Sequence, residues 1–350
     1  MSRRKKTALV VCPGRGTYNK AELGYLKHHH ADKQPLIAAI DAYREAEGQE
    51  PVSVLDGRAR YSLGEMSRGD NASPLIYACA YADFLSIDRD AFEVVAVTGN
   101  SMGWYIALAC AAAAGEMAAL KIVNTMGRLM QESLIGGQLI YPLVDENWRE
   151  VPGRRAELLA LVERINGEPD QALYLSIELG GLMVFGGNNP ALAALEAVLP
   201  PAPERYPLRL ANHAAFHTPL QQPIAARGRE LLDQSLFRRP DLPLIDGRGK
   251  IWTPFASDPA ALRDYTLSQQ VVTPYDFTRA IQVGVKEFAP EALIILGPGT
   301  TLGATTAQAL IALEWQGLTN KADFIARQKD DPVILAMGMA EQRSRVVASL

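Results

Sequence analysis

The stretch "VVAVTGNSMGWYIALACAAAAG", residues 94–115, decides the fold of this chain. It opens with an apolar run typical of a buried strand and closes with an alanine-rich run typical of a buried helix. The turn between them, Gly99-Asn100-Ser101-Met102-Gly103, matches G-x-S-x-G in the strand-to-helix context of a nucleophile elbow. Such a turn exposes the serine hydroxyl beside the N–H groups of the next helix. The alternative is that Ser101 is only a small residue in a tight turn.

The segments on either side of this turn alternate between strand and helix patterns. Short apolar runs at 7–14 and 292–299 end in Pro-Gly or Gly-Pro-Gly turns and indicate further buried strands. Apolar residues recur at helical spacing over 73–87, with Ser73 as the expected N-cap before a proline, and again over 116–133. The alternation predicts an α/β fold around a mostly parallel sheet.

The middle of the chain has a different order of elements. Strand and helix patterns follow one another as β-α-β-β-α-β, with the last strand expected over 205–212, which is the order of a ferredoxin-like unit. We therefore expect a small ferredoxin-like domain over 136–212, inserted into a discontinuous core made of 1–135 and 213–350. The cleft between the two is the natural place for a ligand.

Composition and charge exclude several classes of protein. The net charge of −4 gives no electrostatic reason to expect nucleic acid as a partner. The basic start precedes an apolar run too short for a signal peptide or a membrane span. Cys12, Cys79 and Cys110 lie in apolar runs without metal-ligand spacing, so buried free thiols in a reducing cytoplasm are expected. The histidine run 28–30 is expected on a solvated loop or helix face, and no metal site is expected.

A serine nucleophile needs a base, and two histidines are placed to supply one. His213 and His217 lie in "LANHAAFHTPLQ", where the chain returns from the small domain to the core. His217 precedes Thr-Pro at this junction and is the better candidate. His213 is the runner-up, and a structural role stays open for either.

Five stretches, in the same order, resemble the malonyl-CoA:acyl-carrier-protein transacylases and the acyltransferase domains of polyketide synthases. "VVCPGRGTYN" resembles the PGQGSQ loop of that family, and "VTGNSMGWYIAL" its GHSLGEY elbow. "MGRLMQES" resembles the helix that ends in MQE, "HAAFHTPL" the FHSPL histidine loop and "LGPGTTLGA" the late GPGxxL turn. The stretches run from residue 7 to about 312. The resemblance implies an α/β-hydrolase-like core with an inserted ferredoxin-like domain.

The resemblance also implies a reaction and a set of residues. An acyl group from coenzyme A forms an ester on Ser101 and passes to the phosphopantetheine thiol of an acyl carrier protein, in fatty acid or polyketide biosynthesis. His217 is then the general base, and the backbone N–H groups of Met102 and Arg15 form the oxyanion hole. The backbone carbonyl of Asp276 is expected to orient the histidine. Its side-chain carboxylate either adds to that interaction or only caps a helix. No bound cofactor is implied.

Three departures from the family pattern concern the acyl group. The family arginine that pairs with the malonyl carboxylate corresponds to Met126, and Arg128 is two residues further on, which on a helix points away from that face. Malonyl is therefore disfavoured unless another cation replaces that arginine. Arg15, at the family's glutamine position, is the candidate, with a surface salt bridge as the alternative. Asn100 and Trp104 replace a histidine and a glutamate beside the serine, and Trp104 either shapes the acyl pocket or packs in the core.

Two other functions stay open at this point. A hydrolase that removes acyl groups from carrier proteins would use the same serine and histidine, with water as the acceptor. A catalytically weak protein that only binds a carrier protein would not need both residues. The acyltransferase is the leading hypothesis.

Overall fold

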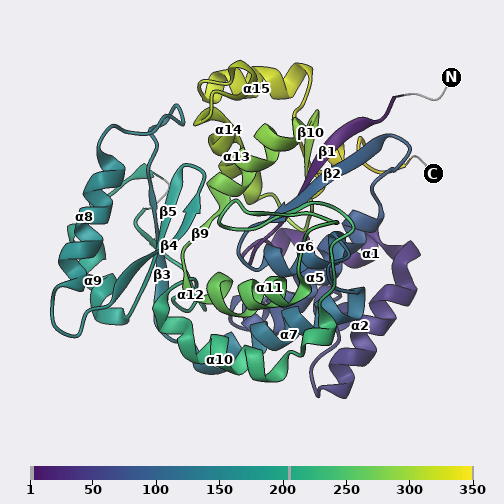
Figure 1. Cartoon of the computed structure of the whole chain (residues 1–350), viewed down its shortest axis with the longest axis horizontal. Coiled ribbons are helices and arrows are strands. Elements are labelled where there is room, and N and C mark those ends of the chain that lie inside the picture. The colour runs from purple at the N-terminus through teal and green to yellow at the C-terminus, as the bar shows by residue number, and fades with distance from the viewer. Residues whose placement is uncertain (1–3, 204–205, 349–350) are drawn as a thin grey trace.

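The computed structural model describes residues 4–203 and 206–348, and a six-stranded sheet lies at its centre (Figure 1). The strands are β1 (Lys6–Cys12), β2 (Phe92–Gly99), β7 (Leu244–Ile245), β8 (Ile251–Trp252), β10 (Ala292–Ile295) and β11 (Ile334–Ala336). Their order is β11-β10-β1-β2-β7-β8, parallel throughout except for β8, which pairs antiparallel to β7. The α/β fold class with a mostly parallel sheet is confirmed.

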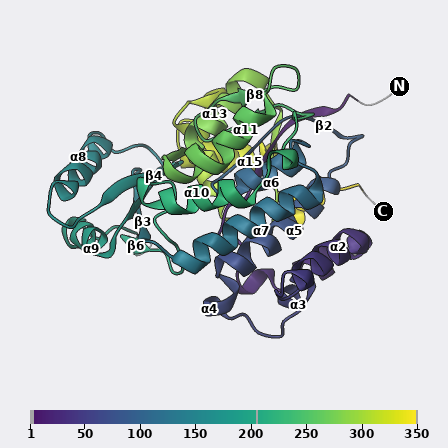
Figure 2. The same cartoon turned by 60° about the horizontal axis from the view of Figure 1, so that its bottom comes forward.

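Helices cover both faces of this sheet, with α13 and α14 on one face and α5, α6 and α7 on the other (Figures 1 and 2). The helices before the second sheet are α1 (Tyr25–His29), α2 (Gln34–Ala46), α3 (Val52–Asp56), α4 (Leu63–Met66), α5 (Gly69–Leu85), α6 (Gly103–Cys110) and α7 (Glu116–Ser133). The later ones are α10 (Gln222–Leu231), α11 (Pro259–Asp264), α12 (Gln270–Val272), α13 (Phe277–Phe288), α14 (Leu302–Ile311), α15 (Lys321–Asp330) and α16 (Ala340–Arg343). No helix within the described ranges is long and apolar enough to span a bilayer.

A second sheet of five strands stands beside the first and has its own core (Figure 1). Its elements are β3 (Gly137–Pro142), α8 (Arg154–Asn166), β4 (Leu173–Leu179), β5 (Leu182–Gly187), α9 (Asn189–Val198), β6 (Leu208–Arg209) and β9 (Tyr275–Asp276). The strand order is β6-β3-β5-β4-β9. The strand expected over 205–212 is reduced to β6, and residue 205 lies outside the described residues. Because β9 comes from the later segment of the chain and pairs with β4, it joins this sheet to the core.

Helix α5 begins earlier than its sequence pattern indicates. It starts at Gly69 and continues through Pro74, so the expectation that Ser73 caps it is wrong. Pro74 has no N–H to give to the carbonyl of Asp70, one turn before it. The buried guanidinium of Arg44 donates to that carbonyl instead, at 2.8 Å. A side chain from α2 therefore supplies the hydrogen bond that the proline removes.

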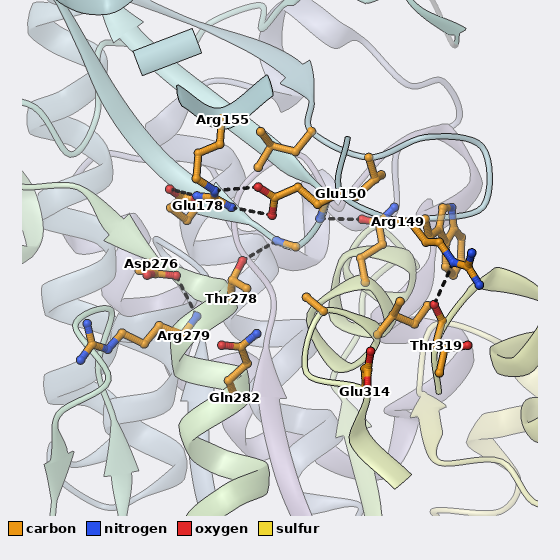
Figure 3. Close-up of a pocket in the computed structure, with 18 residues that line it drawn as sticks. Arg149, Glu150, Arg155, Glu178, Asp276, Thr278, Arg279, Gln282, Glu314 and Thr319 are labelled. Atoms are coloured by element: carbon orange, nitrogen blue, oxygen red, sulfur yellow. Dashed lines mark hydrogen bonds and ion pairs between the residues drawn. The ribbon is translucent and has the colours of Figure 1, made fainter. Parts of the chain in front are cut away.

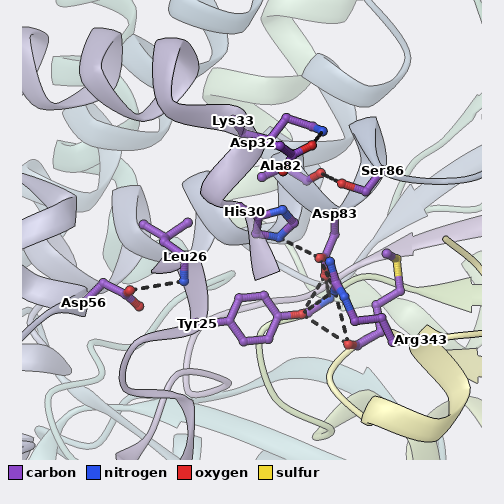
Figure 4. A network of polar contacts seen from close by, with 12 residues as sticks. Tyr25, Leu26, His30, Asp32, Lys33, Asp56, Ala82, Asp83, Ser86 and Arg343 are labelled. Carbon is purple, nitrogen blue, oxygen red and sulfur yellow. Dashed lines mark hydrogen bonds and ion pairs between the residues drawn. The ribbon is translucent and has the colours of Figure 1, made fainter. Parts of the chain in front are cut away.

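The buried carboxylate of Asp83 connects segments that are far apart in the sequence (Figure 4). Asp83 on α5 accepts from His30 at 2.9 Å, from Tyr25 at 2.8 Å, from Arg343 on α16 and from the backbone N–H of Gly297 at 2.7 Å. The expectation of a solvated face for residues 28–30 is thus wrong for His30, which is fully buried, while its two neighbours are exposed. The network fixes the C-terminal helix and the Gly-Pro-Gly turn against α5.

The three cysteines match their expected state. Cys12, Cys79 and Cys110 are all buried and free. Burial raises the pKa of the Cys12 and Cys79 thiols well above the ordinary value, which keeps them protonated and unreactive.

The Asp83 network generates a prediction about stability. Burial alone would raise the pKa of Asp83, but the His30 hydrogen bond and the Arg343 charge hold it below its usual value. Asp83→Asn leaves the Arg343 cation buried without a counter-charge, and we expect it to lower the free energy of unfolding in urea by about 3–5 kcal/mol. Because the pKa is lowered on folding, the wild-type contribution is present at neutral pH and is lost as pH falls through the folded pKa.

Asp32→Asn is the matched control, since Asp32 pairs with Lys33 at the surface and its side chain is 66% exposed. It should change the unfolding free energy little. Equal effects of the two substitutions would contradict a stabilising role for the buried network.

Candidate active site

Ser101 lies in the turn between β2 and α6, in a backbone conformation that side chains rarely adopt. Its φ is 54°, in the left-handed region. Asn100 donates its N–H to the carbonyl of Cys12 at 3.0 Å, so the turn is held on the end of β1. A Cβ on Gly103 would lie 2.3 Å from that same carbonyl oxygen, which excludes any larger residue. The G-x-S-x-G spacing therefore places the serine hydroxyl at the carboxyl edge of the sheet.

The Ser101 hydroxyl contacts a histidine from a distant part of the chain. The distance from Ser101 Oγ to His217 Nε2 is 2.7 Å, and His217 Nδ1 lies 2.6 Å from the backbone carbonyl of Gln270. A carbonyl only accepts, so Nδ1 carries the proton and Nε2 is free to accept from the serine. Burial lowers the pKa of His217 to about 4, although the Gln270 carbonyl opposes the shift. The imidazole is therefore neutral at physiological pH and able to act as a base.

Gln270, not Asp276, provides the carbonyl that orients the histidine. The Gln270 side chain also donates to the Ser101 carbonyl at 3.1 Å and accepts from the Tyr105 hydroxyl at 2.9 Å, so it holds both partners. Asp276 instead caps α13 by accepting from the Arg279 N–H at 2.7 Å. The expectation for Asp276 is thus corrected in favour of its capping alternative. Sequence reasoning missed Gln270 because every residue has a backbone carbonyl.

Two backbone N–H groups beside the serine are available to a ligand. Met102 and Arg15 both line the same small pocket as Ser101. Within the described ranges, neither of their N–H groups donates a hydrogen bond. Free N–H groups next to a nucleophile are the usual means of stabilising an oxyanion. The geometry is therefore compatible with the oxyanion hole expected at these two residues.

Ser101 lies between a small inner pocket and a larger outer chamber. The inner pocket has about 20 Å³, room for about one water molecule, and its walls include Ser73 on α5, Met130 on α7 and Phe216. The outer chamber has about 330 Å³ and a mostly apolar wall from the second sheet and α14, which includes Ile140, Ile177, Leu179, Leu182, Val184 and Leu302. Arg15 and Ser101 line both spaces.

The inner pocket is narrow because α5 and α7 cross closely (Figure 2). A Cβ on Gly127 would lie 2.4 Å from the carbonyl oxygen of Gly69 on α5. This crossing turns Val123 and Met130 of α7 toward the pocket. Met126, on the same helix, is fully buried beside Gly228 of α10 and lines neither space.

Two other residues expected near the acyl group also lie elsewhere. Arg128 is partly exposed, and its guanidinium lies 3.8 Å from the Glu132 carboxylate on the outer side of α7. Trp104 is fully buried and donates to the Thr266 hydroxyl at 3.0 Å, in edge contact with Tyr265. The alternative of core packing therefore holds for Trp104. The substrate-binding role expected for Met126, Arg128 and Trp104 finds no pocket contact, whereas Asn100 lines the outer chamber beside Ser101.

His213 lies in the outer chamber but does not contact Ser101. Its Nδ1 lies 2.9 Å from the Gln138 side-chain oxygen, and Gln138 in turn donates to Ser176 at 2.7 Å. Burial, together with the nearby Arg15 charge, lowers the pKa of His213 well below the ordinary value. His213 is thus a neutral residue of the chamber wall, and His217 is the histidine that the fold brings to the serine.

Another cavity, of about 730 Å³, is larger than either of these two spaces (Figure 3). Its lining includes three charged residues that already pair with one another, since Arg155 contacts Glu150 and Glu178 at 3.1 and 2.5 Å. Ser101 and His217 are not among its lining residues. The size of a cavity therefore does not identify the candidate active site in this fold.

The low pKa of His217 predicts the pH dependence of Ser101 reactivity. The rate of Ser101 modification by an organic sulfonyl fluoride should stay level from pH 7 to pH 5 and fall as the pH approaches 4, where His217 becomes protonated. Rates are measured by intact mass, corrected for hydrolysis of the reagent, with circular dichroism at each pH to check the fold. A loss of rate centred near the ordinary histidine pKa of about 6.5 would contradict the buried, neutral imidazole.

Comparison with known proteins finds relatives that are named as transacylases and polyketide synthases. No protein-family model matches the chain. A phenolphthiocerol/phthiocerol polyketide synthase of Mycobacterium tuberculosis is 26% identical over 316 residues, which cover 88% of this chain. The chain spans 19% of the length of that synthase. The malonyl CoA-acyl carrier protein transacylase of Haemophilus influenzae is 22% identical and matches over 92% of this chain and 98% of its own length.

Solved structures show the same fold. The malonyl-CoA:acyl carrier protein transacylase of Xanthomonas oryzae superposes with a TM-score of 0.76 at 18% identity, over 99% of this chain and all of its own. A malonyl-transacylase solved in complex with a type II polyketide synthase acyl-carrier protein superposes with a TM-score of 0.71 at 18% identity, over 98% of this chain and 99% of its own. The homologues and structural neighbours of this chain are thus malonyl-CoA:acyl carrier protein transacylases and polyketide synthases, as its motifs indicate.

Proposed function

We propose that this chain is an acyltransferase that moves an acyl group from coenzyme A to an acyl carrier protein through an ester on Ser101. The observation that carries the proposal is the aligned set of Ser101, His217 and the Gln270 carbonyl, next to two free N–H groups. A serine, a base of fixed tautomer and an oxyanion site are the parts that acyl transfer requires. A protein that only binds its partner needs none of them.

In the first half-reaction, Ser101 Oγ attacks the thioester carbon while His217 Nε2 takes the hydroxyl proton. The carbonyl oxygen becomes an oxyanion, which the N–H groups of Met102 and Arg15 stabilise. The tetrahedral intermediate then breaks its C–S bond, and the coenzyme A sulfur takes the proton from His217. The products are free coenzyme A and an acyl ester on Ser101.

The second half-reaction is the same sequence in reverse, with a new thiol. The phosphopantetheine sulfur of the carrier protein attacks the ester carbon and gives its proton to His217. The C–O bond to Ser101 breaks, and the serine oxygen takes that proton back. The apolar outer chamber provides the route by which both pantetheine arms approach the serine, and its walls limit the access of water.

The proposal includes an acyl carrier protein as the acceptor of the acyl group. Support comes from the structural neighbour that was solved in complex with an acyl-carrier protein and from the relatives named as transacylases and polyketide synthases. We infer a role in fatty acid or polyketide synthesis. Met126 does not take part in the choice of acyl group, because it is apolar and lies outside both spaces.

A single-turnover experiment tests the transfer and separates it from hydrolysis. The protein is incubated with an acyl-coenzyme A, freed of small molecules, and then mixed with holo acyl carrier protein or with buffer alone, and the adduct is followed by intact mass. We expect an adduct in the wild type and none in Ser101→Ala, because the variant has no nucleophile. We expect the thiol to remove the acyl group at least about 10-fold faster than water does.

The other outcomes identify the alternatives. Equal rates with and without the carrier protein would support the hydrolase. The absence of an adduct and of coenzyme A release, from donors with and without a terminal carboxylate, would contradict both enzymes and favour a binding protein.

A further inference from the structure

Arg15 is an isolated cation at the candidate active site. Of the described residues that line the inner pocket and the outer chamber, it is the one with a permanently charged side chain. The other ionisable groups of note are His213 and His217, and burial lowers the pKa of both. A ligand in either space therefore meets a single formal charge, and that charge is positive.

Most N–H groups of the Arg15 guanidinium donate no hydrogen bond to the described residues. One terminal nitrogen donates to the carbonyls of Ser67 at 2.6 Å and Asn212 at 3.0 Å. Nε is buried and has no acceptor, and the second terminal nitrogen donates no hydrogen bond in the described part of the chain. The cation also lies 5.3 Å from the centre of the Phe216 ring. These contacts hold the side chain in place but leave most of its five N–H groups unused.

Arg15 also has no carboxylate partner. Within the described ranges, no Asp or Glu oxygen lies within 4 Å of its guanidinium. The Asp70 carboxylate opposes the lowering of the Arg15 pKa from a distance, but it already accepts from Arg68 at 3.0 and 2.8 Å. Burial lowers the pKa of Arg15 to about 10, so it stays protonated at neutral pH. Arg15 is partly exposed, but its Nε is buried. A partly buried charge without a counter-charge is a favourable site for an anionic ligand.

The position of Arg15 limits which anion it can bind. Arg15 lines both spaces together with Ser101, the residue that the thioester carbon must reach, so its side chain lies near that end of the donor. The phosphates of coenzyme A lie at the far end of the pantetheine arm and are out of reach. An anion on the acyl group itself fits, and a carboxylate matches the planar donors of a guanidinium.

We propose that Arg15 binds the free carboxylate of a dicarboxylic acyl group, of which malonyl is the smallest, while the thioester carbon is at Ser101. This inference rests on the proposed acyltransferase function. It places the carboxylate subsite on the loop after β1, whereas the corresponding wall of α7 carries no charge. One residue then supplies a backbone N–H to the oxyanion and a side chain to the carboxylate.

Acylation rates for two donors test this assignment. Wild type, Arg15→Gln and Arg15→Lys are each mixed with malonyl-coenzyme A or acetyl-coenzyme A, and the rate of the Ser101 adduct is measured by intact mass. Arg15→Gln should slow malonyl transfer by about 10- to 100-fold, since a hydrogen-bonded charge partner is lost. The acetyl rate, which does not depend on a carboxylate subsite, should fall much less than the malonyl rate, so the ratio of the malonyl rate to the acetyl rate should drop by about 10-fold or more. Arg15→Lys keeps the charge and should lose less of the malonyl rate than Arg15→Gln.

Arg327→Gln is the control for loss of an arginine outside the site, because Arg327 pairs with Asp331 on exposed α15. It should alter neither rate. Equal losses with both donors in Arg15→Gln would show that Arg15 only braces the Ser67 and Asn212 loops and would overturn the proposal. An unchanged malonyl rate, or a wild type that accepts acetyl alone, would overturn it as well while leaving the acyltransferase standing. A wild type that accepts neither donor would count against the proposed function itself.

Discussion

The left-handed backbone at Ser101 is the constraint on which the candidate site depends. It is sustained by the contact of Gly103 with the end of β1 and by the hydrogen bond from Asn100 to Cys12. Residues are held in such conformations only where the surrounding structure determines them. Because β1 and β2 are adjacent parallel strands, their carboxyl ends meet, and the Arg15 loop is brought beside the serine. The sheet thus places the nucleophile and both free N–H groups at one edge.

The general base, His217, is held in position by the backbone of the segment that contains Gln270. The Gln270 carbonyl fixes the His217 tautomer, and the Gln270 side chain ties the same segment to the serine carbonyl and to Tyr105 on α6. In the part of the chain that the structure describes, no carboxylate contacts His217, so burial alone keeps the histidine neutral. Such a base has a low proton affinity in the resting state, and it gains a favourable partner only when an oxyanion or thiolate forms beside it.

Much of this architecture was predictable from local patterns. The strand at Phe92–Gly99, the helix at Glu116–Ser133 and the elbow between strand and helix follow from periodicity and turn chemistry. The start of α5 at Gly69 did not follow from a local pattern. Pro74 leaves the carbonyl of Asp70 without its usual donor, and Arg44 of another helix donates to it instead. His30 looked solvated because its partner, Asp83, is 53 residues away. The face of α7 that meets the pocket depends on its crossing with α5, which no pattern within α7 reveals.

The structure of an acylated crystal would show whether Ser101 carries the acyl group and whether Arg15 binds its carboxylate. We would soak crystals of the protein with malonyl-coenzyme A and determine the position of the acyl group. We expect an ester on Ser101 Oγ, with its carbonyl oxygen at the N–H groups of Met102 and Arg15 and its carboxylate at the Arg15 guanidinium. An acyl group attached to another residue, or a Ser101 that stays free while malonyl lies elsewhere, would contradict the account.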